Sequence, residues 1–151
     1  MWLLGGLELE ANRRAVEAPP GRPARALLAW LALHPGTHAR SRVAAALWPE
    51  VLDESARLSL RGALTALRRA LGEQAEAVTA TREQIGLAPD VWIDVREFDR
   101  LASAGRFADA IELHRGDLLP ELDHDWVLEA RDERRAALAE ATARLADAEE
   151  E

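Results

Sequence analysis

The stretch "ESARLSLRGALTALRRALG", residues 54–72, determines how the rest of the chain is interpreted. Its leucines and arginines recur three and four residues apart, which is the repeat of an α-helix with one apolar and one polar side. We expect Asp53 or Ser55 to cap the start of this helix and Gly72 to end it. The pattern predicts a helix whose polar side is made largely of arginine.

The two sides of this helix differ in chemistry. At about 100° per residue, the apolar residues gather within one arc, which is the predicted core face. This face consists of Ala56, Leu60, Ala63, Leu64, Leu67, Ala70 and Leu71. The opposite side carries Arg57, Leu58, Arg61, Thr65, Arg68 and Arg69. No acid lies between Arg57 and Arg69, so these arginines have no partner within the helix, although a simply solvated face is the alternative explanation.

An arginine stripe of this kind suits the major groove of DNA. A helix that reads this groove needs forked donors for guanine and phosphate, a hydroxyl group, and an apolar group for the thymine methyl. The arginines supply the first, and Thr65 and Leu58 supply the other two. The side opposite the core is therefore the candidate DNA-binding surface.

The neighbouring segments predict a winged helix-turn-helix. Helical spacing predicts two earlier helices, over about residues 24–33 and 40–48, each followed by proline. The alternation around Leu7 and Leu9 predicts a small antiparallel β unit before them, with a turn at residues 11–12. Residues 78–81 and 84–87 predict a hairpin hinged near Arg82, which becomes a candidate contact with the adjacent groove. The predicted DNA-binding domain spans residues 1–93.

The chain over residues 94–151 predicts a second domain, which is all-helical. We expect three helices, with one clear loop over residues 116–125. The last helix carries an apolar ridge of Ala137, Leu138, Ala141, Leu145 and Ala148. Because no following helix covers this ridge, we expect the first part of a longer domain and a chain that self-associates. The predicted fold class is mainly α with small antiparallel β-sheets.

Charge is distributed unevenly along the chain. The net charge is −8, yet residues 1–90 hold 11 arginines against 10 acids, whereas residues 91–151 hold 8 against 17. The chain has no cysteine, no apolar run near the ~20 residues of a membrane span, and no signal-peptide pattern after Met1. We therefore expect a soluble, cytoplasmic protein without membrane contact, disulfides or thiolate chemistry.

Signals for catalysis or metal binding are weak. His34 and His38 have the spacing of a helical metal pair, but residues 35–36, proline and glycine, separate them. The acidic segment "ELDHDW", residues 121–126, fits no calcium-loop ligand scheme and is better explained as a loop before a helix. No glycine-rich loop has the spacing of a phosphate-binding motif. We expect no catalytic residue, no metal and no cofactor.

Several motifs together resemble a known family of regulators. "LLGGLEL", "RALLAWLALHPG", "ALWPE", "SLRGALTALRRALG" and "VWIDVREFDRL" occur in this order, and "HRGDLLPEL" and "DWVLEARDERR" follow. The first group is similar to the OmpR-type (OmpR/PhoB-type) winged helix of the antibiotic regulatory protein family of transcriptional activators, the SARP family. The second group is similar to the start of its bacterial transcriptional activation domain (BTAD), which is TPR-like.

The resemblance carries specific implications. It implies that the third helix is the recognition helix, so that five of its residues face DNA: Arg57, Arg61, Thr65, Arg68 and Arg69. It also implies a homodimer on double-stranded DNA whose half-sites are direct repeats, and RNA polymerase as a protein partner. The helical second domain would help the protein to dimerise and position it for transcription.

The function that these observations favour is sequence-specific DNA binding by a transcriptional regulator, an activator and not an enzyme. Two alternatives stay open. In the first, the protein is an interaction adaptor with weak or lost DNA binding, which agrees with the net charge of −8. In the second, it is the regulatory front end of a larger signalling protein or ATPase. The salt dependence of binding to DNA separates the first alternative from the favoured function.

Overall fold

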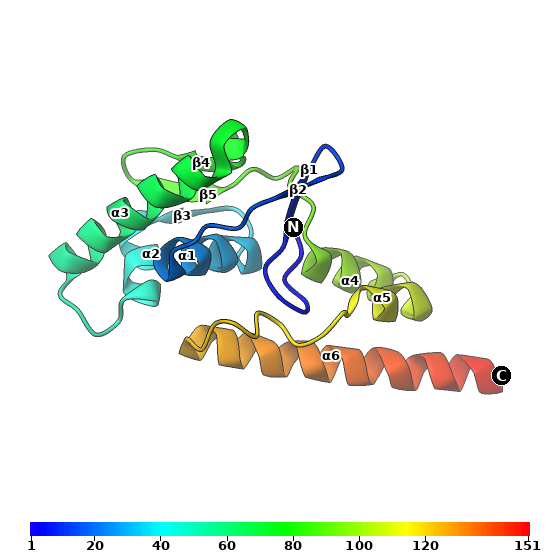
Figure 1. The fold of residues 1–151 in the computed structure, drawn as a ribbon. Coiled ribbons are helices and arrows are strands. Elements are labelled where there is room, and N and C mark those ends of the chain that lie inside the picture. Colours follow the sequence, from blue (N-terminus) through cyan, green and yellow to red (C-terminus); the bar gives the residue numbers. More distant parts are fainter. The chain divides into compact units, whose positions relative to one another are not determined.

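The computed structural model describes all of residues 1–151 and contains six α-helices and two small antiparallel sheets (Figure 1). The expectation of a mainly helical chain with small antiparallel sheets is confirmed. The chain divides into two compact units. The first unit is Glu8–Val91, and the second unit combines Met1–Leu7 with Trp92–Glu151. The N-terminal segment, which the sequence grouped with the first predicted domain, thus belongs with the C-terminal helices.

The first unit begins with a two-stranded hairpin. Strand β1 (Leu9–Ala11) pairs antiparallel with β2 (Arg14–Val16). Asn12 and Arg13 form the turn, with φ angles of 53° and 65°. Positive φ at both central residues gives the two-residue turn that matches the twist of the flanking strands. The predicted β unit is confirmed, with its turn one residue further along the chain than expected.

Three helices follow, namely α1 (Arg22–Leu33), α2 (Arg40–Leu47) and α3 (Asp53–Leu71). Gly72 ends α3 with a φ of 53°, as expected for a residue that follows a helix. The expected N-cap is wrong, because Leu52 holds the cap position and makes no side-chain capping bond. Asp53 lies instead inside the first turn, where a carboxylate interacts favourably with the helix dipole.

A three-stranded sheet completes the first unit. It consists of β3 (Thr37–Ala39), β4 (Val78–Ala80) and β5 (Gln84–Leu87), in the order β3-β5-β4 with antiparallel pairing throughout. A short 3-10 helix (Gly72–Ala77) joins α3 to β4. The predicted hairpin is confirmed as β4 and β5. Strand β3 was not predicted, because three residues with little burial give no alternating pattern.

The apolar face of α3 forms much of the core of the first unit. Leu60, Leu64 and Leu67 are at most 6% exposed, whereas Ala70, at the edge of the predicted arc, is half-buried. Both α1 and α2 pack against α3. The helical repeat therefore identified the core face correctly, and the opposite face of α3 is left to solvent.

Two histidines contact a tryptophan at the end of α1. The ring of His34 stacks on that of Trp30 with centroids 4.0 Å apart, and the ring of His38 meets Trp30 edge-on at 4.8 Å. His34 Nδ1 bonds to the carbonyl oxygen of Trp30 at 2.8 Å. Burial lowers the pKa of His34; the bond to Trp30 opposes this shift, whereas His38 and Arg42 reinforce it.

We expect the first unit to lose stability as the pH falls from about 7 to about 5. A histidine whose pKa is lower in the fold than in the unfolded chain takes up its proton mainly on unfolding. Its contribution is present above about pH 6.5 and is lost as the pH falls through the folded-state pKa. Urea unfolding at several pH values measures this, and His34→Gln should flatten the dependence. Equal slopes for the parent and His34→Gln would contradict the expectation.

The second unit contains α4 (Asp94–Ser103), α5 (Phe107–Leu113) and α6 (Asp125–Glu150), as expected in outline. Its core cluster consists of Phe98, Leu101, Ala110 and Ala141. The prediction of an uncovered ridge on the last helix is corrected here. Ala141 is buried in this cluster and Ala137 and Leu138 pack against it, because α4 and α5 fold onto α6. Towards the end of α6 the ridge is open, and Ala148 is exposed.

Asp94, the first residue of α4, holds the N-terminal segment of the chain. Its carboxylate is fully buried and accepts the N–H groups of Leu3 at 3.0 Å and Leu4 at 2.8 Å. It also accepts the N–H group of Val95 at 2.8 Å. Burial raises the pKa of this carboxyl, and the backbone bonds counteract the shift. Leu4 in turn forms a β-bridge with Leu118, which fixes the segment within the second unit.

Arg131 of α6 holds the loop that precedes this helix. Its guanidinium donates to the carbonyl oxygens of Leu118 at 2.8 Å, Leu119 at 2.7 Å and Leu122 at 2.9 Å. Leu119 has a φ of 44°, which is unfavourable for a leucine. The loop therefore depends on these bonds for its conformation.

Candidate nucleic-acid interface

The first unit has a hollow of about 520 Å³ between α3, the start of α2 and the β4–β5 hairpin. The residues that line it are Ala39, Arg40, Ser41, Arg57, Leu60, Arg61, Arg82 and Glu83. We call this space the arginine hollow. Three predicted contact residues, Arg57, Arg61 and Arg82, lie around it, although they come from a helix and from a hairpin.

Local structure explains how these three side chains meet. Arg57 and Arg61 are four residues apart, so they lie on successive turns of the same face of α3. Both are exposed because the opposite face is packed in the core. Arg82 lies in the turn between β4 and β5. Thr81 fixes this turn, because its N–H donates to the carbonyl of Gln84 at 2.9 Å and its hydroxyl oxygen accepts the N–H of Gln84 at 3.1 Å.

Arg40 is a lining residue that the sequence reasoning missed. It is the first residue of α2, where a positive charge opposes the helix dipole. Its Nε is buried and has no hydrogen-bond partner, while its backbone N–H donates to the carbonyl of Glu83 at 2.9 Å. The sequence did contain one signal for this role, namely an arginine at the start of a helix, where its charge is unfavourable. An anion bound from outside would compensate this unfavourable charge.

Four residues of the predicted stripe lie outside the arginine hollow, namely Leu58, Thr65, Arg68 and Arg69. Thr65 is exposed and donates its hydroxyl proton to the carbonyl of Arg61 at 3.0 Å, so its oxygen is left as an acceptor. Leu58 is 60% exposed, as an outward apolar group near the start of the helix. Arg69 is also exposed. These side chains are accessible on α3 but are not grouped with the others.

Arg68 is bound within the first unit. Its Nη2 donates to the carbonyl oxygen of Val78 at 3.0 Å and thereby links the last turns of α3 to the start of β4. The side chain is otherwise accessible. Arg68 therefore supports the hairpin that carries Arg82, in addition to any contact that it makes outside the protein.

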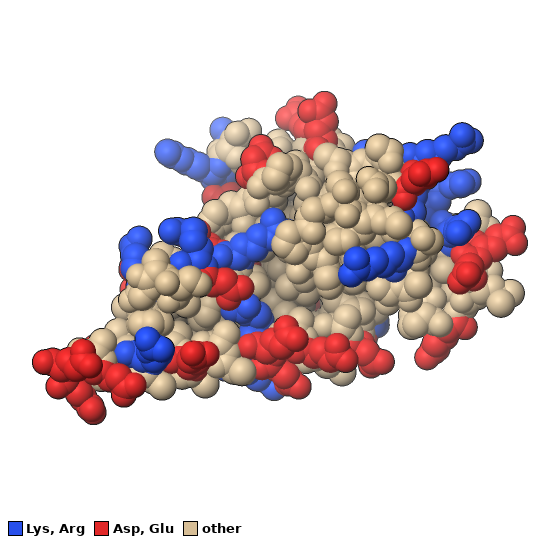
Figure 2. Space-filling model, turned by 180° about the vertical axis from the view of Figure 1, so that it is seen from behind, with Lys and Arg blue, Asp and Glu red and all other residues tan.

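The charge of the arginine hollow differs from that of the whole chain. Glu83 is the only acid among its lining residues, against four arginines. The excess acid belongs to the second unit, which has 17 acidic residues and 8 arginines. Figure 2 shows acidic side chains spaced along the long C-terminal helix and gathered at its end. A net charge of −8 therefore coexists with a locally positive concave surface.

Comparisons with protein-family models, with curated proteins and with solved structures gave no match. The site is therefore interpreted from its own geometry and from the motifs in the sequence. None of the helices combines the length and the apolar character that crossing a membrane requires.

Proposed function

We propose that the first unit is a winged helix-turn-helix that binds double-stranded DNA, and that the protein is a transcriptional regulator. The observation that carries this proposal is the grouping of Arg40, Arg57, Arg61 and Arg82 around one hollow. Like charges held this close repel one another, and a polyanion that enters the hollow relieves the repulsion. DNA phosphates supply such charges at regular intervals.

The order of the elements supports the proposal. Helix α1, strand β3, helices α2 and α3, and the β4–β5 hairpin follow one another, and the sheet order is β3-β5-β4. A helix-turn-helix places its second helix in the major groove, and a hairpin that follows it serves as a wing over the neighbouring groove. In this chain α3 is the proposed recognition helix, and Arg82 is the proposed wing contact.

The family resemblance supports the further details. By that resemblance the second unit is the start of a TPR-like activation domain, and the protein is an activator with RNA polymerase as its partner. A homodimer would bind direct repeats, which require a head-to-tail or flexibly tethered arrangement because a two-fold dimer reads a palindrome. No chemistry of an enzyme is needed for this function.

The contact residues are expected to differ in what they contribute to DNA binding. Arg61 lies in the middle of the stripe, so Arg61→Ala should cost about 1–3 kcal/mol of binding free energy and relax the base preference at one position. Arg40→Ala and Arg57→Ala should weaken binding to all sequences and lower the salt slope by about one unit each. Selection of bound sequences from a random pool, followed by fluorescence titration at several salt concentrations, measures both effects.

Two controls make this test specific. Arg14→Ala removes the same charge from an exposed strand outside the hollow and should leave the affinity unchanged. Leu64→Ala removes a buried core side chain and should abolish binding through loss of folding, which a thermal melt detects. If a variant without Arg57, Arg61 and Arg82 melts normally and binds DNA as tightly as the parent, the arginine face is merely solvated. The interaction adaptor would then be the better explanation.

A further inference from the structure

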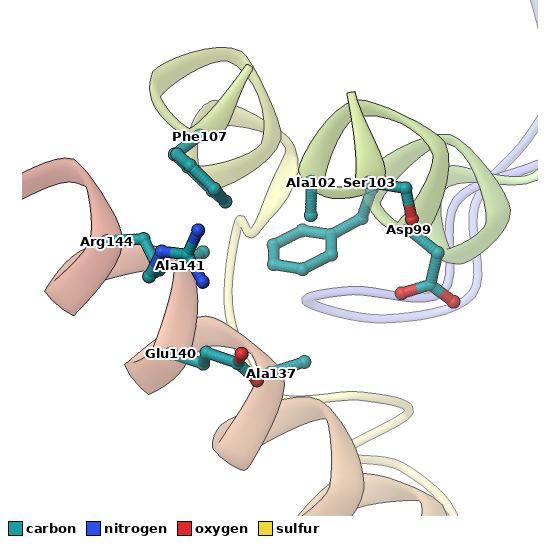
Figure 3. Close-up of a pocket in the computed structure, with 9 residues that line it drawn as sticks. Asp99, Ala102, Ser103, Phe107, Ala137, Glu140, Ala141 and Arg144 are labelled. Carbon is teal, nitrogen blue, oxygen red and sulfur yellow. The ribbon is translucent and has the colours of Figure 1, made fainter. Parts of the chain in front are cut away.

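The second unit has a groove of about 460 Å³ between α4, α5 and α6. Figure 3 shows Ala102 on α4, Phe107 on α5, and Ala137 and Ala141 on α6 facing this space. Phe98 also lines it and belongs to the core cluster below. We call this space the α4–α6 groove. Its lining combines apolar with polar side chains, and three of the residues are alanines, whose small side chains leave room for a side chain from another molecule.

The rim of the groove is polar and mostly acidic. Asp99 and Glu140 lie at its edge, together with Arg144 (Figure 3). Asp99 already pairs with Arg134 at 2.6 Å, and the Arg144 guanidinium lies over the ring of Phe107 at 5.5 Å. Glu140 is exposed and takes part in no ion pair. The rim therefore offers one carboxylate without an ion-pair partner beside the alanines of the groove.

Glu140 is part of an acidic row. Glu133 and Asp147 lie seven residues before and after it, so all three fall on one side of α6, at intervals of roughly 10 Å. All three are exposed, and none forms an ion pair in the structure. Arg144 is the one cation beside this row, four residues after Glu140 and three before Asp147. Three carboxylates beside a groove lined in part by alanine and phenylalanine are complementary to a helix with apolar anchors and basic residues at the same interval.

We propose that the α4–α6 groove is a docking site for a basic amphipathic helix of a partner protein. The second unit has 17 acids against 8 arginines, and this negative charge disfavours other occupants of the groove. A second copy of this unit would bring like charges together, and nucleic acids and anionic membranes carry the same sign of charge. A cationic partner helix gains from both the apolar part of the groove lining and the acidic row. This proposal concerns the second unit and does not depend on DNA binding by the first.

The test uses the full chain and a synthetic helical peptide. The peptide has leucine at every third or fourth position and lysine at every seventh, and a matched peptide has glutamate in place of lysine. We expect the lysine peptide to bind with an anisotropy change that weakens between ~0.1 M and ~1 M salt, and the glutamate peptide not to bind. Equal binding of both peptides would overturn the proposal.

Two variants identify the groove as the site. Ala102→Leu fills the groove without changing charge, and Glu140→Arg inverts the charge at its rim. Each variant should weaken binding of the lysine peptide by about tenfold or more. The matched controls are Ala146→Leu and Glu149→Arg, which lie elsewhere on α6, are exposed, and should have little effect. Glu140 is on the surface, so its variant should fold even if Ala102→Leu does not.

The remaining outcomes also decide the proposal. If Ala102→Leu melts like the parent and binds the lysine peptide equally well, the peptide is attracted to the acidic surface in general and the groove is not its site. If sedimentation shows a dimer of the chain that Ala102→Leu dissociates, the occupant is a second copy. Either result overturns docking of a basic partner helix, and neither bears on the DNA-binding test of the first unit.

Discussion

Replacement of Asp94 by alanine is expected to lower the stability of the second unit by about 3–5 kcal/mol. The carboxylate is fully buried and accepts backbone N–H groups from Leu3, Leu4 and Val95. Without it, these donors are left without a partner in the interior, and each such group costs about 1–3 kcal/mol. Part of this cost will be avoided if the N-terminal segment detaches into water.

Urea unfolding measures this change, and hydrogen exchange must accompany it because tryptophan fluorescence reports on both units, through Trp2 and Trp92 of the second and Trp30 of the first. Hydrogen exchange at Leu3 and Leu4 should accelerate in the variant. Asp109→Ala is the control, since Asp109 belongs to the same unit but pairs with Arg106 at the surface, where the two side chains are 48% and 59% exposed. Such a pair contributes about 1 kcal/mol at most. A similar loss in both variants would show that burial of Asp94 is not what stabilises the segment.

The sequence predicted the elements of the fold well where a repeat or a chain-breaking residue defined them. The leucines of α3 recur three and four residues apart, which places them on one side of a helix, and this side packs in the core. The hairpin was predicted from its strand-like residues and the hinge near Arg82. Strand β3 was not, because it is short and is held by its pairing with β5 and not by its own side chains.

The candidate site was predicted in part. Arg57 and Arg61 could be placed on one face from their spacing alone, since that depends only on helix geometry. The position of Arg40 beside them depends on how α2 packs against the β4–β5 hairpin. A local sequence pattern does not predict this packing. The bond from Arg68 to the carbonyl of Val78 likewise depends on the path of the chain after α3. The role of Asp94 as an anchor for residues 1–4 was also invisible, because its partners are backbone groups far away in sequence.

The alternation at Leu7 and Leu9 shows a further limit of pattern reading. Both residues are buried, and the pattern suggested a single β unit. In the structure Leu7 belongs to the second unit and Leu9 to β1 of the first. Alternation indicates that one side of an extended chain is buried, but it does not identify which unit the buried side chains pack against.

Gly86→Ala is expected to destabilise the first unit by about 3 kcal/mol, at the upper end of the range for overpacking. Gly86 of β5 is paired with Thr37 of β3, and its position leaves no room for a side chain. A Cβ atom there would overlap the carbonyl oxygen of Gly36 and lie 3.1 Å from the Cα of Thr37. These are backbone atoms, so the clash is relieved only if β3 separates from β5.

The same change should impair DNA binding through the geometry of the arginine hollow. The backbone N–H of Arg40 donates to the carbonyl of Glu83 where β3 ends, so separation of the strands displaces Arg40 and Arg82 together. Gly86→Ala should therefore weaken binding more than Arg82→Ala does, even under conditions where the variant remains folded.

Gly62→Ala is the contrasting control for stability, because this helical position has no atom within 4 Å of the added Cβ and alanine should stabilise α3 by roughly 1 kcal/mol. Opposite shifts of the two melting temperatures are the expected result, and a normal melt with normal DNA affinity for Gly86→Ala would contradict the role of β3 in positioning the hairpin.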